Sequence, residues 1–350
     1  MTASLRIGFV GAGGIARAMQ IPTFQKNDKV QVVAIADVVQ QAVDAAVVDF
    51  GIPHGYTDYR EMFTKEELNA VVVCTPNKFH APISIAALDQ GLHVLCEKPM
   101  ALNATEAAAM TRAARASGKI LMIAYRYRQQ AVARAAKTII ASGELGEIYM
   151  IRVNGLRRRG IPSWGVFTNK EMQGGGALVD YGVHLLDLAL WLAGNPRPLE
   201  VSGITSRRLG TRPNVNPWGQ WDYENFQVED HAAAFIRFAG GTAMQLEVSW
   251  ALNIADSSES ISFSGTEGGL DVFPLKVYNA KHGMLGNWEP IWFPGKDQKD
   301  WDLQAADFVD AVIKGHEPTV KPEEAQRVSQ IVDAIYASSE CGAAVNIDQS

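Results

Sequence analysis

Cysteine is scarce in this chain of 350 residues, which contains only Cys74, Cys96 and Cys341. An odd, low count without a C-x-x-C pair argues against a disulfide framework and against a structural zinc site. We therefore expect a protein of the reducing cytoplasm that binds no metal ion.

Long apolar runs and basic blocks are missing as well. No uncharged apolar run approaches the ~18 residues of a membrane-spanning helix, and the apolar stretch 177–193 contains two aspartates and a histidine. The first apolar run, Leu5–Val10, leads directly into glycines, so we expect no signal peptide. The formal net charge is −6, and the densest basic stretch is Arg157–Arg159. This pattern predicts neither a nucleic-acid partner nor a membrane partner.

The length and composition suit a globular protein of two domains. Hydrophobic residues make up 47% of the chain and charged residues 20%, which excludes wholesale disorder. Residues 1–125 alternate short apolar runs with helical patterns, which predicts βαβ units and a doubly wound parallel sheet. The predicted strands are 5–10, 30–36, 70–74, 93–96 and 120–124, and the predicted helices are 15–26, 39–50, 81–90 and 104–116.

The pattern changes after about residue 128. Successive strand patterns between 199 and 281 predict a large open sheet that is mainly antiparallel. The Gly/Pro-rich segment 282–299 is predicted to be a loop. Helices are predicted over 131–142, 177–193, 302–314 and 322–340. The expected fold class is therefore α/β, with a first domain in 1–125 and an α+β domain for substrate binding and oligomerisation in 126–350. The last helices can pack back on the first domain.

A glycine-rich turn follows the first predicted strand. Residues Gly11–Ala16 (GAGGIA) fit G-x-G-x-x-G/A and open a helix. Glycine allows the tight turn and leaves room for a pyrophosphate, while the helix N-terminus offers free N–H groups. Asp37 ends the second predicted strand, where a ribose-binding acid is expected, although a helix N-cap is the ordinary alternative. Together they predict a Rossmann domain, and a carboxylate that repels a 2′-phosphate favours NAD over NADP.

Three ionisable residues lie on the apolar predicted helix 177–193. Asp180, His184 and Asp187 are spaced to share one helix face. Charged groups on a buried helix cost free energy unless they are paired or used. A structural His–Asp cluster and a metal site are alternatives, but no further Cys or His is clustered nearby. Histidine titrates near neutral pH, which suits proton transfer coupled to hydride transfer.

The motifs in their order resemble the glucose–fructose oxidoreductase/inositol dehydrogenase (Gfo/Idh/MocA) family over nearly the whole chain. They are GFVGAGGIAR (8–17), AIAD (34–37), CTPNKFH (74–80), CEKPMALN (96–103), AYRYR (124–128) and GGGALVDYGVHLLDLALWLAG (174–194). The E-K-P after the fourth predicted strand and the D-x-G-x-H of the later helix, behind one Rossmann turn, make the set specific.

The resemblance implies a role for each matching residue. Lys98 is similar to the family's catalytic lysine beside the nicotinamide, and Asp180 with His184 matches its acid–histidine pair. Pro99 matches a proline whose preceding peptide bond is commonly cis. The implied cofactor-binding residues are Gly11, Gly13, Gly14, Ile15, Asp37, Thr75, Pro76, Asn77, His80, Glu97, Lys98 and Arg126. The expected substrate-binding residues are Lys98, Tyr125, Arg128, Arg157, Trp164, Asp180 and His184, with Trp218, Trp221 and Tyr223 as further candidates.

The resemblance also implies a reaction, the reversible oxidation of a secondary hydroxyl of a sugar, polyol or cyclitol by NAD. His184 would take the hydroxyl proton, Lys98 would stabilise the developing alkoxide, and Asp180 would hold Lys98 or the substrate. The alternatives are an NAD-dependent glycosidase of the same fold, a non-catalytic dinucleotide-binding regulator, and tightly held NADP cycling between two sugars. We also expect a homodimer or homotetramer.

Overall fold

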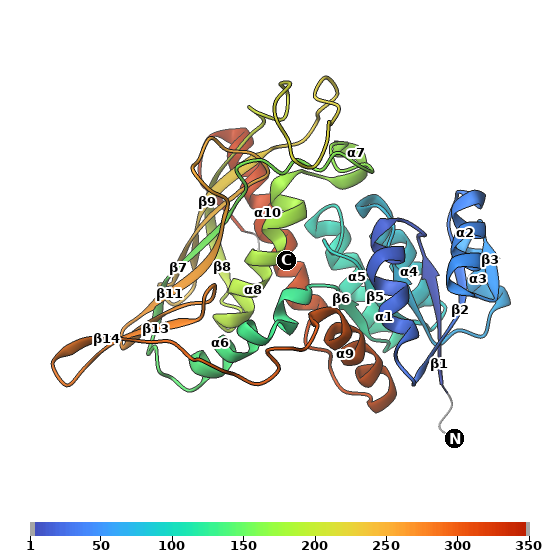
Figure 1. The fold of residues 1–350 in the computed structure, drawn as a ribbon, viewed down its shortest axis with the longest axis horizontal. Helices are drawn as coiled ribbons and strands as arrows, with labels where there is room; N and C mark the ends of the chain where they lie inside the picture. The colour runs from blue at the N-terminus through green and yellow to red at the C-terminus, as the bar shows by residue number, and fades with distance from the viewer. Residues whose placement is uncertain (1–3, 348–350) are drawn as a thin grey trace. The chain divides into compact units, whose positions relative to one another are not determined.

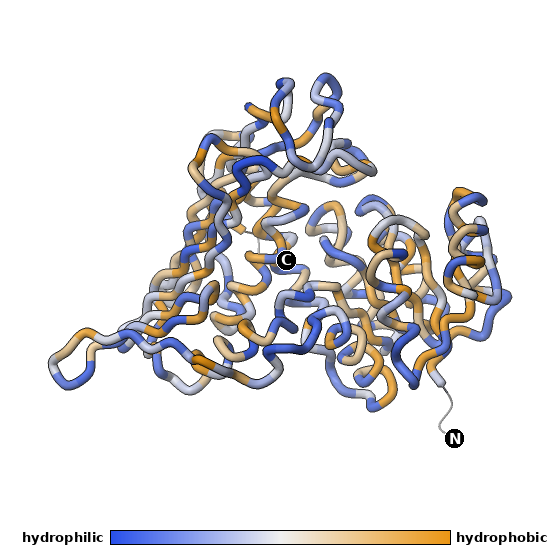
Figure 2. Tube along the Cα trace, viewed as in Figure 1, coloured by the Kyte–Doolittle hydropathy of each residue, from blue (hydrophilic) through white to orange (hydrophobic). Residues whose placement is uncertain are grey.

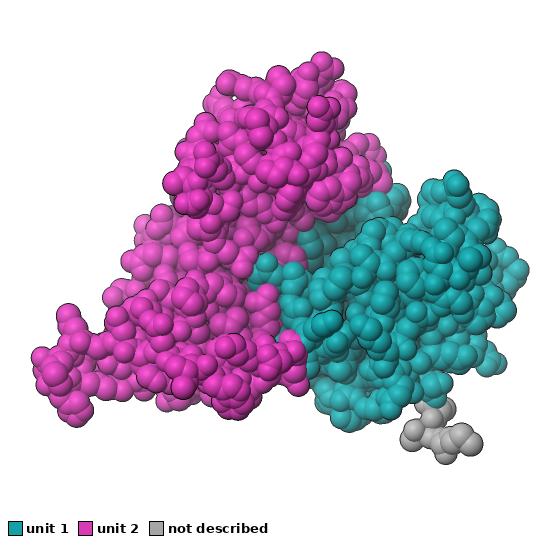
Figure 3. Space-filling model, in the orientation of Figure 1, with its two compact units in different colours: residues 1–129, 299–326 teal, residues 130–298, 327–350 magenta. Residues whose placement is uncertain are grey.

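The computed structural model describes residues 4–347 (Figure 1). The chain divides into two compact units, which Figure 3 distinguishes by colour. Unit 1 comprises residues 1–129 and 299–326, and unit 2 comprises residues 130–298 and 327–350. Among the helices of residues 4–347, none combines the length and apolar character needed to cross a bilayer.

Unit 1 contains a six-stranded sheet in the order β3-β2-β1-β4-β5-β6, and every neighbouring pair is parallel. The strands are β1 (Leu5–Val10), β2 (Val30–Ala36), β3 (His54–Tyr56), β4 (Ala70–Val73), β5 (His93–Cys96) and β6 (Leu121–Ile123). Strands of a parallel sheet are covered on both faces, so they are apolar throughout; β4 is entirely buried, and β1 is largely orange in Figure 2. The predicted doubly wound sheet is confirmed, with its strand order reversing between β1 and β4.

Helices of unit 1 come mostly from the crossovers between strands. They are η1 (Ala16–Gln20), α1 (Ile21–Gln25), α2 (Gln40–Phe50), α3 (Tyr59–Lys65), η2 (Asn77–Phe79), α4 (His80–Asp89), α5 (Ala104–Ser117), η3 (Arg126–Gln129) and α9 (Asp300–Lys314). The Asp58 and Asn103 side chains cap α3 and α5. Helix α9 comes from far along the chain and packs through Phe308 edge-on against Phe24, whose ring meets Phe9 in the same way.

Unit 2 contains a nine-stranded sheet in the order β14-β13-β12-β11-β7-β10-β9-β8-β15. Its strands are β7 (Ile148–Leu156), β8 (Pro198–Ser206), β9 (His231–Phe238), β10 (Ala243–Ser249), β11 (Ser258–Gly265), β12 (Gly268–Asp271), β13 (Lys276–Lys281), β14 (Met284–Trp288) and β15 (Val345–Asn346). Strands β7 and β10 pair in parallel and the other pairs are antiparallel, which confirms the predicted open, mainly antiparallel sheet. The prediction of a loop over 282–299 is wrong at its start, because β13 and β14 form a hairpin about His282 and Gly283, both with positive φ.

Helices α6 (Ala131–Ala141), α7 (Lys170–Gln173), η4 (Leu178–Gly182) and α8 (Val183–Leu192) belong to unit 2, while α10 (Pro322–Cys341) begins in unit 1 and continues in unit 2. The predicted helix 177–193 is divided into a π-helical turn, η4, and the α-helix α8. Gly155 of β7 lets this helix approach closely, since a Cβ there would lie 2.6 Å from the Leu185 side chain. The π-helical turn carries Asp180, and such turns are frequent at functional sites.

Candidate active site

The glycine turn after β1 has two parts with different geometry. Gly11 has φ +98°, and a Cβ on it would lie 2.7 Å from the backbone carbonyl of Cys74 at the end of β4. No other residue fits there, because both the conformation and the contact exclude a side chain. A Cβ on Gly13 or Gly14 would instead meet nothing within 4 Å. Gly11 therefore shapes the turn, and the next two glycines leave an open cradle at the start of η1.

Asp37 joins the end of β2 to the glycine turn. One of its carboxylate oxygens accepts a hydrogen bond from the Ala12 N–H at 2.8 Å, and the other accepts from the Val39 N–H at 2.9 Å. The helix N-cap alternative is not what the structure shows, because Val39 is the N-cap of α2 and Asp37 instead forms an Asx turn with the Val39 N–H. A carboxylate has about four acceptor sites, so each oxygen still has capacity to accept from a ribose hydroxyl.

The segment after β4 and the segment after β5 are joined by a buried histidine. The two ring nitrogens of His80 lie 2.7 Å from the Pro99 carbonyl oxygen and 2.9 Å from that of Thr75. Burial lowers the pKa of His80, which favours the neutral ring. This predicted cofactor residue therefore holds two loops together. The buried Thr75 hydroxyl has no hydrogen-bond partner among residues 4–347.

Glu97, Lys98 and Pro99 follow β5, and the Lys98–Pro99 peptide bond is cis, as the resemblance implied. Glu97 is buried and accepts a hydrogen bond of 2.6 Å from the Gln20 amide, while burial raises its pKa. Lys98 is half-buried. Sequence reasoning missed Gln20, because nothing in its neighbourhood on η1 marks it as a partner of a residue 77 positions away.

The arginines after β6 are engaged within unit 1. Arg126 pairs with Asp300 at the start of α9 and lies over the rings of Tyr127 and Trp301. The fully buried Arg128 pairs with Glu324 and donates to the Thr319 carbonyl at 3.0 Å. Arg128 was predicted to bind substrate, but its guanidinium is enclosed by these partners. Tyr125, predicted for the same role, is 1% exposed.

In unit 2, the start of the helix that bears Asp180 is fixed by Glu229. The buried carboxylate of Glu229 accepts hydrogen bonds of 2.9 Å from the N–H groups of Gly176 and Leu178 and one of 3.0 Å from the Tyr336 hydroxyl. Burial raises the pKa of Glu229. A Cβ on Gly176 would lie 2.0 Å from the Glu229 carbonyl oxygen, so the glycine here is needed for close packing.

Asp180 itself is held by residues from three other segments. Its Oδ2 accepts a hydrogen bond of 3.0 Å from the Trp250 indole N–H and lies 3.9 Å from Arg157. The Arg157 guanidinium is stacked between the rings of Tyr181 at 4.2 Å and Trp218 at 4.6 Å. We call Asp180, Trp250, Arg157, Tyr181 and Trp218 the Asp180 network. It fixes the orientation of the carboxylate in an otherwise apolar helix.

Trp218 of the Asp180 network forms an exposed aromatic pair with Trp164. The rings of Trp164 and Trp218 lie 5.7 Å apart, and these residues are 54% and 40% exposed. Trp221, in contrast, is buried in a small hydrophobic cluster and donates to the Gly210 carbonyl, and Tyr223 packs against that cluster. The structure thus brings Arg157, Trp164 and Asp180 together in unit 2. His184 lies half-buried on α8, one turn beyond Asp180, and Asp187 is fully buried.

Two family models match the chain: an oxidoreductase family with an NAD-binding Rossmann fold over residues 5–125, and the GFO/IDH/MocA C-terminal domain over residues 133–271. The chain is 33% identical to D-glucoside 3-dehydrogenase of Escherichia coli K12, over 99% of both chains. A crystal structure of an oxidoreductase domain protein from Kribbella flavida matches with a TM-score of 0.86 and 26% identity, covering 99% of this chain and 100% of the other. Levoglucosan dehydrogenase in complex with NADH and levoglucosan matches with a TM-score of 0.83 and 25% identity, at the same coverage.

The open glycine cradle, the parallel sheet and the matching family model define an NAD-binding oxidoreductase. More particularly, the chain belongs to the Gfo/Idh/MocA family. The predicted family, fold class and NAD cofactor are confirmed. The residues present fit NAD: the space at Gly13 and Gly14 suits a pyrophosphate, and the Thr75 hydroxyl is available as a donor.

Proposed function

We propose that this protein is an NAD-dependent dehydrogenase that oxidises a secondary hydroxyl of a sugar or glycoside. Full-length similarity to a D-glucoside 3-dehydrogenase supports this proposal, and within that class it favours the hydroxyl at C3. The fold similarity to levoglucosan dehydrogenase supports a pyranose ring as the substrate. The observation in the structure that carries the proposal is the Asp180 network beside an exposed aromatic pair, on the helix that also bears His184.

The proposed chemistry divides the work among three residues of this chain. His184 accepts the proton of the reacting hydroxyl, and Lys98 donates a hydrogen bond to the same oxygen and stabilises its developing negative charge. Asp180 orients Lys98 or the sugar by hydrogen bonding. NAD held at the glycine cradle would supply the acceptor for the hydride of the carbinol carbon.

The proposed cofactor contacts come from loops at the carboxyl ends of the parallel strands. Gly11, Gly13, Gly14 and Ile15 form the pyrophosphate turn, and Asp37 accepts from the ribose hydroxyls. Thr75, Pro76 and Asn77 line the cofactor, while His80 keeps their loop in place. Glu97, held by Gln20, lies directly before Lys98 and is proposed to face the nicotinamide carboxamide. Arg126 completes the set from η3.

The proposed sugar contacts come from the aromatic pair. Trp164 and Trp218 are both partly exposed, and an aromatic ring suits the C–H face of a pyranose and loses little conformational freedom on binding. Arg157 lies between Trp218 and Asp180 and offers N–H edges to sugar hydroxyls. Arg128 and Tyr125 are buried within unit 1, so we leave direct contact with the sugar to Trp164, Trp218 and Arg157.

Cytoplasmic location and assembly into a homodimer or homotetramer belong to the same proposal. The open sheet exposes Tyr149 of β7, Ile204 of β8 and Phe235 of β9, which are 53%, 61% and 38% exposed. Such an apolar surface favours association between copies of the chain. Light scattering coupled to size-exclusion chromatography measures the molecular mass directly, and a monomer at micromolar concentration would contradict the proposed assembly.

The decisive experiment is a substrate panel measured by NADH absorbance. The panel contains alkyl glucosides, free aldoses, levoglucosan and inositols, each with NAD and with NADP. We expect NADH formation with glucosides, a preference for NAD, and a 3-keto product by NMR. Hydrolysis of a glycoside without net NADH would show a glycosidase instead. NAD binding without turnover of any sugar would show a non-catalytic regulator.

A further inference from the structure

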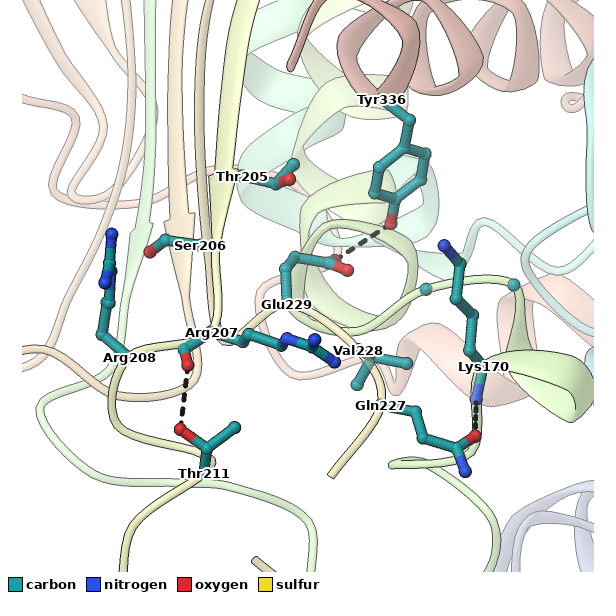
Figure 4. A pocket seen from close by; sticks show the side chains of 12 residues that line it. Lys170, Thr205, Ser206, Arg207, Arg208, Thr211, Gln227, Val228, Glu229 and Tyr336 are labelled. Carbon is teal, nitrogen blue, oxygen red and sulfur yellow. Dashed lines mark hydrogen bonds between the residues drawn. The ribbon is translucent and has the colours of Figure 1, made fainter. Parts of the chain in front are cut away.

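A cavity of about 670 Å³ lies in unit 2, a volume within the ordinary range of small-molecule sites (Figure 4). Four segments form it: α7 with the glycines after it, the end of β8 with the turn that follows, residues 227–229, and α10. None of the predicted cofactor or substrate residues lines it. The lining residues are Lys170, Gly174, Gly175, Thr205, Ser206, Arg207, Arg208, Thr211, Gln227, Val228, Glu229 and Tyr336.

The cavity wall carries three cationic side chains, Lys170, Arg207 and Arg208. Within residues 4–347, none of the three forms an ion pair with an acidic side chain. In Figure 4, Arg207 extends toward Glu229 and Val228, and Lys170 faces them from another wall. Like charges gathered around one cavity repel each other, so an anion bound there would relieve that repulsion.

The single acidic side chain in the lining, Glu229, does not neutralise these cations. Its carboxylate is occupied by the N–H groups of Gly176 and Leu178 and by the Tyr336 hydroxyl. Burial raises the pKa of this carboxyl. The rest of the polar lining consists of neutral donors and acceptors, from Thr205, Ser206, Thr211 and Gln227. The cavity therefore presents an excess of positive charge with hydroxyl groups around it.

We propose that this cavity is a second ligand site, which binds a small molecule through a phosphate group held by Lys170 and Arg207. A guanidinium presents paired N–H donors that match two phosphate oxygens, and a lysine ammonium adds a third donor and a charge. Arg208 also lines the cavity and supplies further donors, while the Thr211 hydroxyl donates to the Arg207 carbonyl and so helps to hold the turn that carries Arg207. Inorganic phosphate and a phosphorylated sugar share this chemistry, and the volume accommodates either.

An occupant of this cavity would contact two segments that lead to residues of the Asp180 network. The loop between Arg207 and Gln227 begins and ends in the cavity wall, and its middle supplies Trp218. Gly174 and Gly175, also in the wall, lead directly into the helix that carries Asp180. The Leu209 and Gly210 N–H groups are already anchored on the Asp230 carboxylate, so the base of this loop is preformed. A bound phosphate therefore stabilises unit 2 by linking these two segments.

The test is calorimetric titration with inorganic phosphate, glucose 6-phosphate and glucose at constant ionic strength set with chloride. NADH is kept at saturation, so that the glycine turn is filled and no sugar is oxidised. We expect saturable binding of inorganic phosphate at one site per chain, displaced by glucose 6-phosphate but not by glucose, whose binding is confined to the proposed sugar site. Arg207→Gln and Lys170→Gln are expected to weaken binding by about tenfold or more, a loss typical of a charge-assisted hydrogen bond. Arg212→Gln, in the same loop but outside the lining, is the matched control and keeps wild-type affinity.

Thermal unfolding gives a second readout that needs no turnover, so it is independent of the proposed dehydrogenase activity. Phosphate is expected to raise the unfolding midpoint of the wild type and of Arg212→Gln but not that of Arg207→Gln, because only a ligand of the folded state stabilises it. The proposal is overturned by absence of saturable phosphate binding, by equal losses in Arg207→Gln and Arg212→Gln, or by glucose displacing inorganic phosphate as well as glucose 6-phosphate does.

Discussion

The two units hold their candidate functional residues by different means. In unit 1 the residues stand at the ends of neighbouring parallel strands, and backbone groups take part in most of the contacts. Gly11 donates to the Ala36 carbonyl, Asp37 accepts from the Ala12 N–H, and His80 lies against two carbonyl oxygens. In unit 2, Asp180 depends on side chains from distant segments, chiefly the Trp250 indole and the stacked Arg157.

The candidate sites of the two units should therefore differ in how well they tolerate amino-acid substitutions. A cradle made of backbone needs glycine where a side chain would collide, and leaves most other positions free. A carboxylate held by side chains loses its orientation when any one of them is shortened. Substitutions in the two units should therefore change stability, cofactor affinity and turnover in different ways.

The largest effect is expected from removing the proposed catalytic groups, one in each unit. Lys98→Ala and His184→Ala should each reduce kcat by roughly 100- to 10,000-fold, the usual contribution of acid–base and electrostatic catalysis. NAD affinity, measured by titration calorimetry, should stay at the wild-type value. Lys26→Ala and His316→Ala alter exposed residues and serve as controls. Turnover like that of the wild type in either active-site variant would refute the assignment.

The glycine turn offers a sharper test within unit 1. Gly11→Ala places a Cβ against the Cys74 backbone at positive φ, so it should lower the free energy of unfolding by about 1–3 kcal/mol or more. Gly13→Ala has free space in the protein and should leave stability unchanged. Because the added methyl group lies where the pyrophosphate approaches, Gly13→Ala should weaken NAD binding by about tenfold or more.

Urea denaturation and NAD titration of these two variants separate the two roles. A stable Gly11→Ala protein would show that the turn tolerates a side chain. Unchanged NAD affinity in Gly13→Ala would show that the cradle is not where the pyrophosphate binds.

The sheet of unit 1 was predicted well from the sequence, and its candidate site residues stand in short motifs directly after the predicted strands. The glycines, Asp37 and the E-K-P segment each follow a strand, and the carboxyl ends of parallel strands meet at one edge of the sheet. The exception is Gln20, whose contact with Glu97 depends on how η1 packs. No pattern of spacing encodes that contact.

The site of unit 2 was predicted only in part, for the same physical reason. Asp180 and His184 are conspicuous in an apolar helix, and the aromatic residues near positions 164 and 218 could be picked out. Trp250 lies at the end of β10 and meets Asp180 only after the sheet has formed, 70 residues away in sequence. The burial of Arg128 against Glu324 likewise depends on a segment almost 200 residues distant. The sequence therefore suggested that Arg128 contacts the substrate.

An intermediate effect is expected from the Asp180 network. Trp250→Phe keeps an aromatic ring but removes the indole N–H that donates to Asp180, so the carboxylate loses its fixed orientation. We expect kcat to fall about tenfold, the effect of losing one charge-assisted hydrogen bond, with NAD affinity unchanged. Trp191→Phe, on α8 but over Lys137, is the matched control. Equal kcat values for the two variants would show that the indole N–H does not position Asp180.

The smallest effect concerns stability in unit 1, away from both sites. The Nδ1 atom of His93 accepts a hydrogen bond of 3.0 Å from the Ile120 N–H, and burial, assisted by Lys119, lowers the pKa of His93 to about 4. Between an unfolded pKa near 6.5 and that folded value, the unfolded chain binds a proton that the folded chain excludes. The stabilisation is therefore complete above about pH 6.5 and is lost as the pH falls toward 4.

The variant His93→Asn tests this prediction, because asparagine keeps a hydrogen-bond acceptor but does not titrate. Urea denaturation at pH 7 and at pH 4.5 should show the wild type losing about 1 kcal/mol more free energy of unfolding than the variant, a value reduced for solvent screening. Parallel losses would mean that the folded and unfolded chains bind a proton at His93 equally over this pH range, so that His93 contributes no pH-dependent stability.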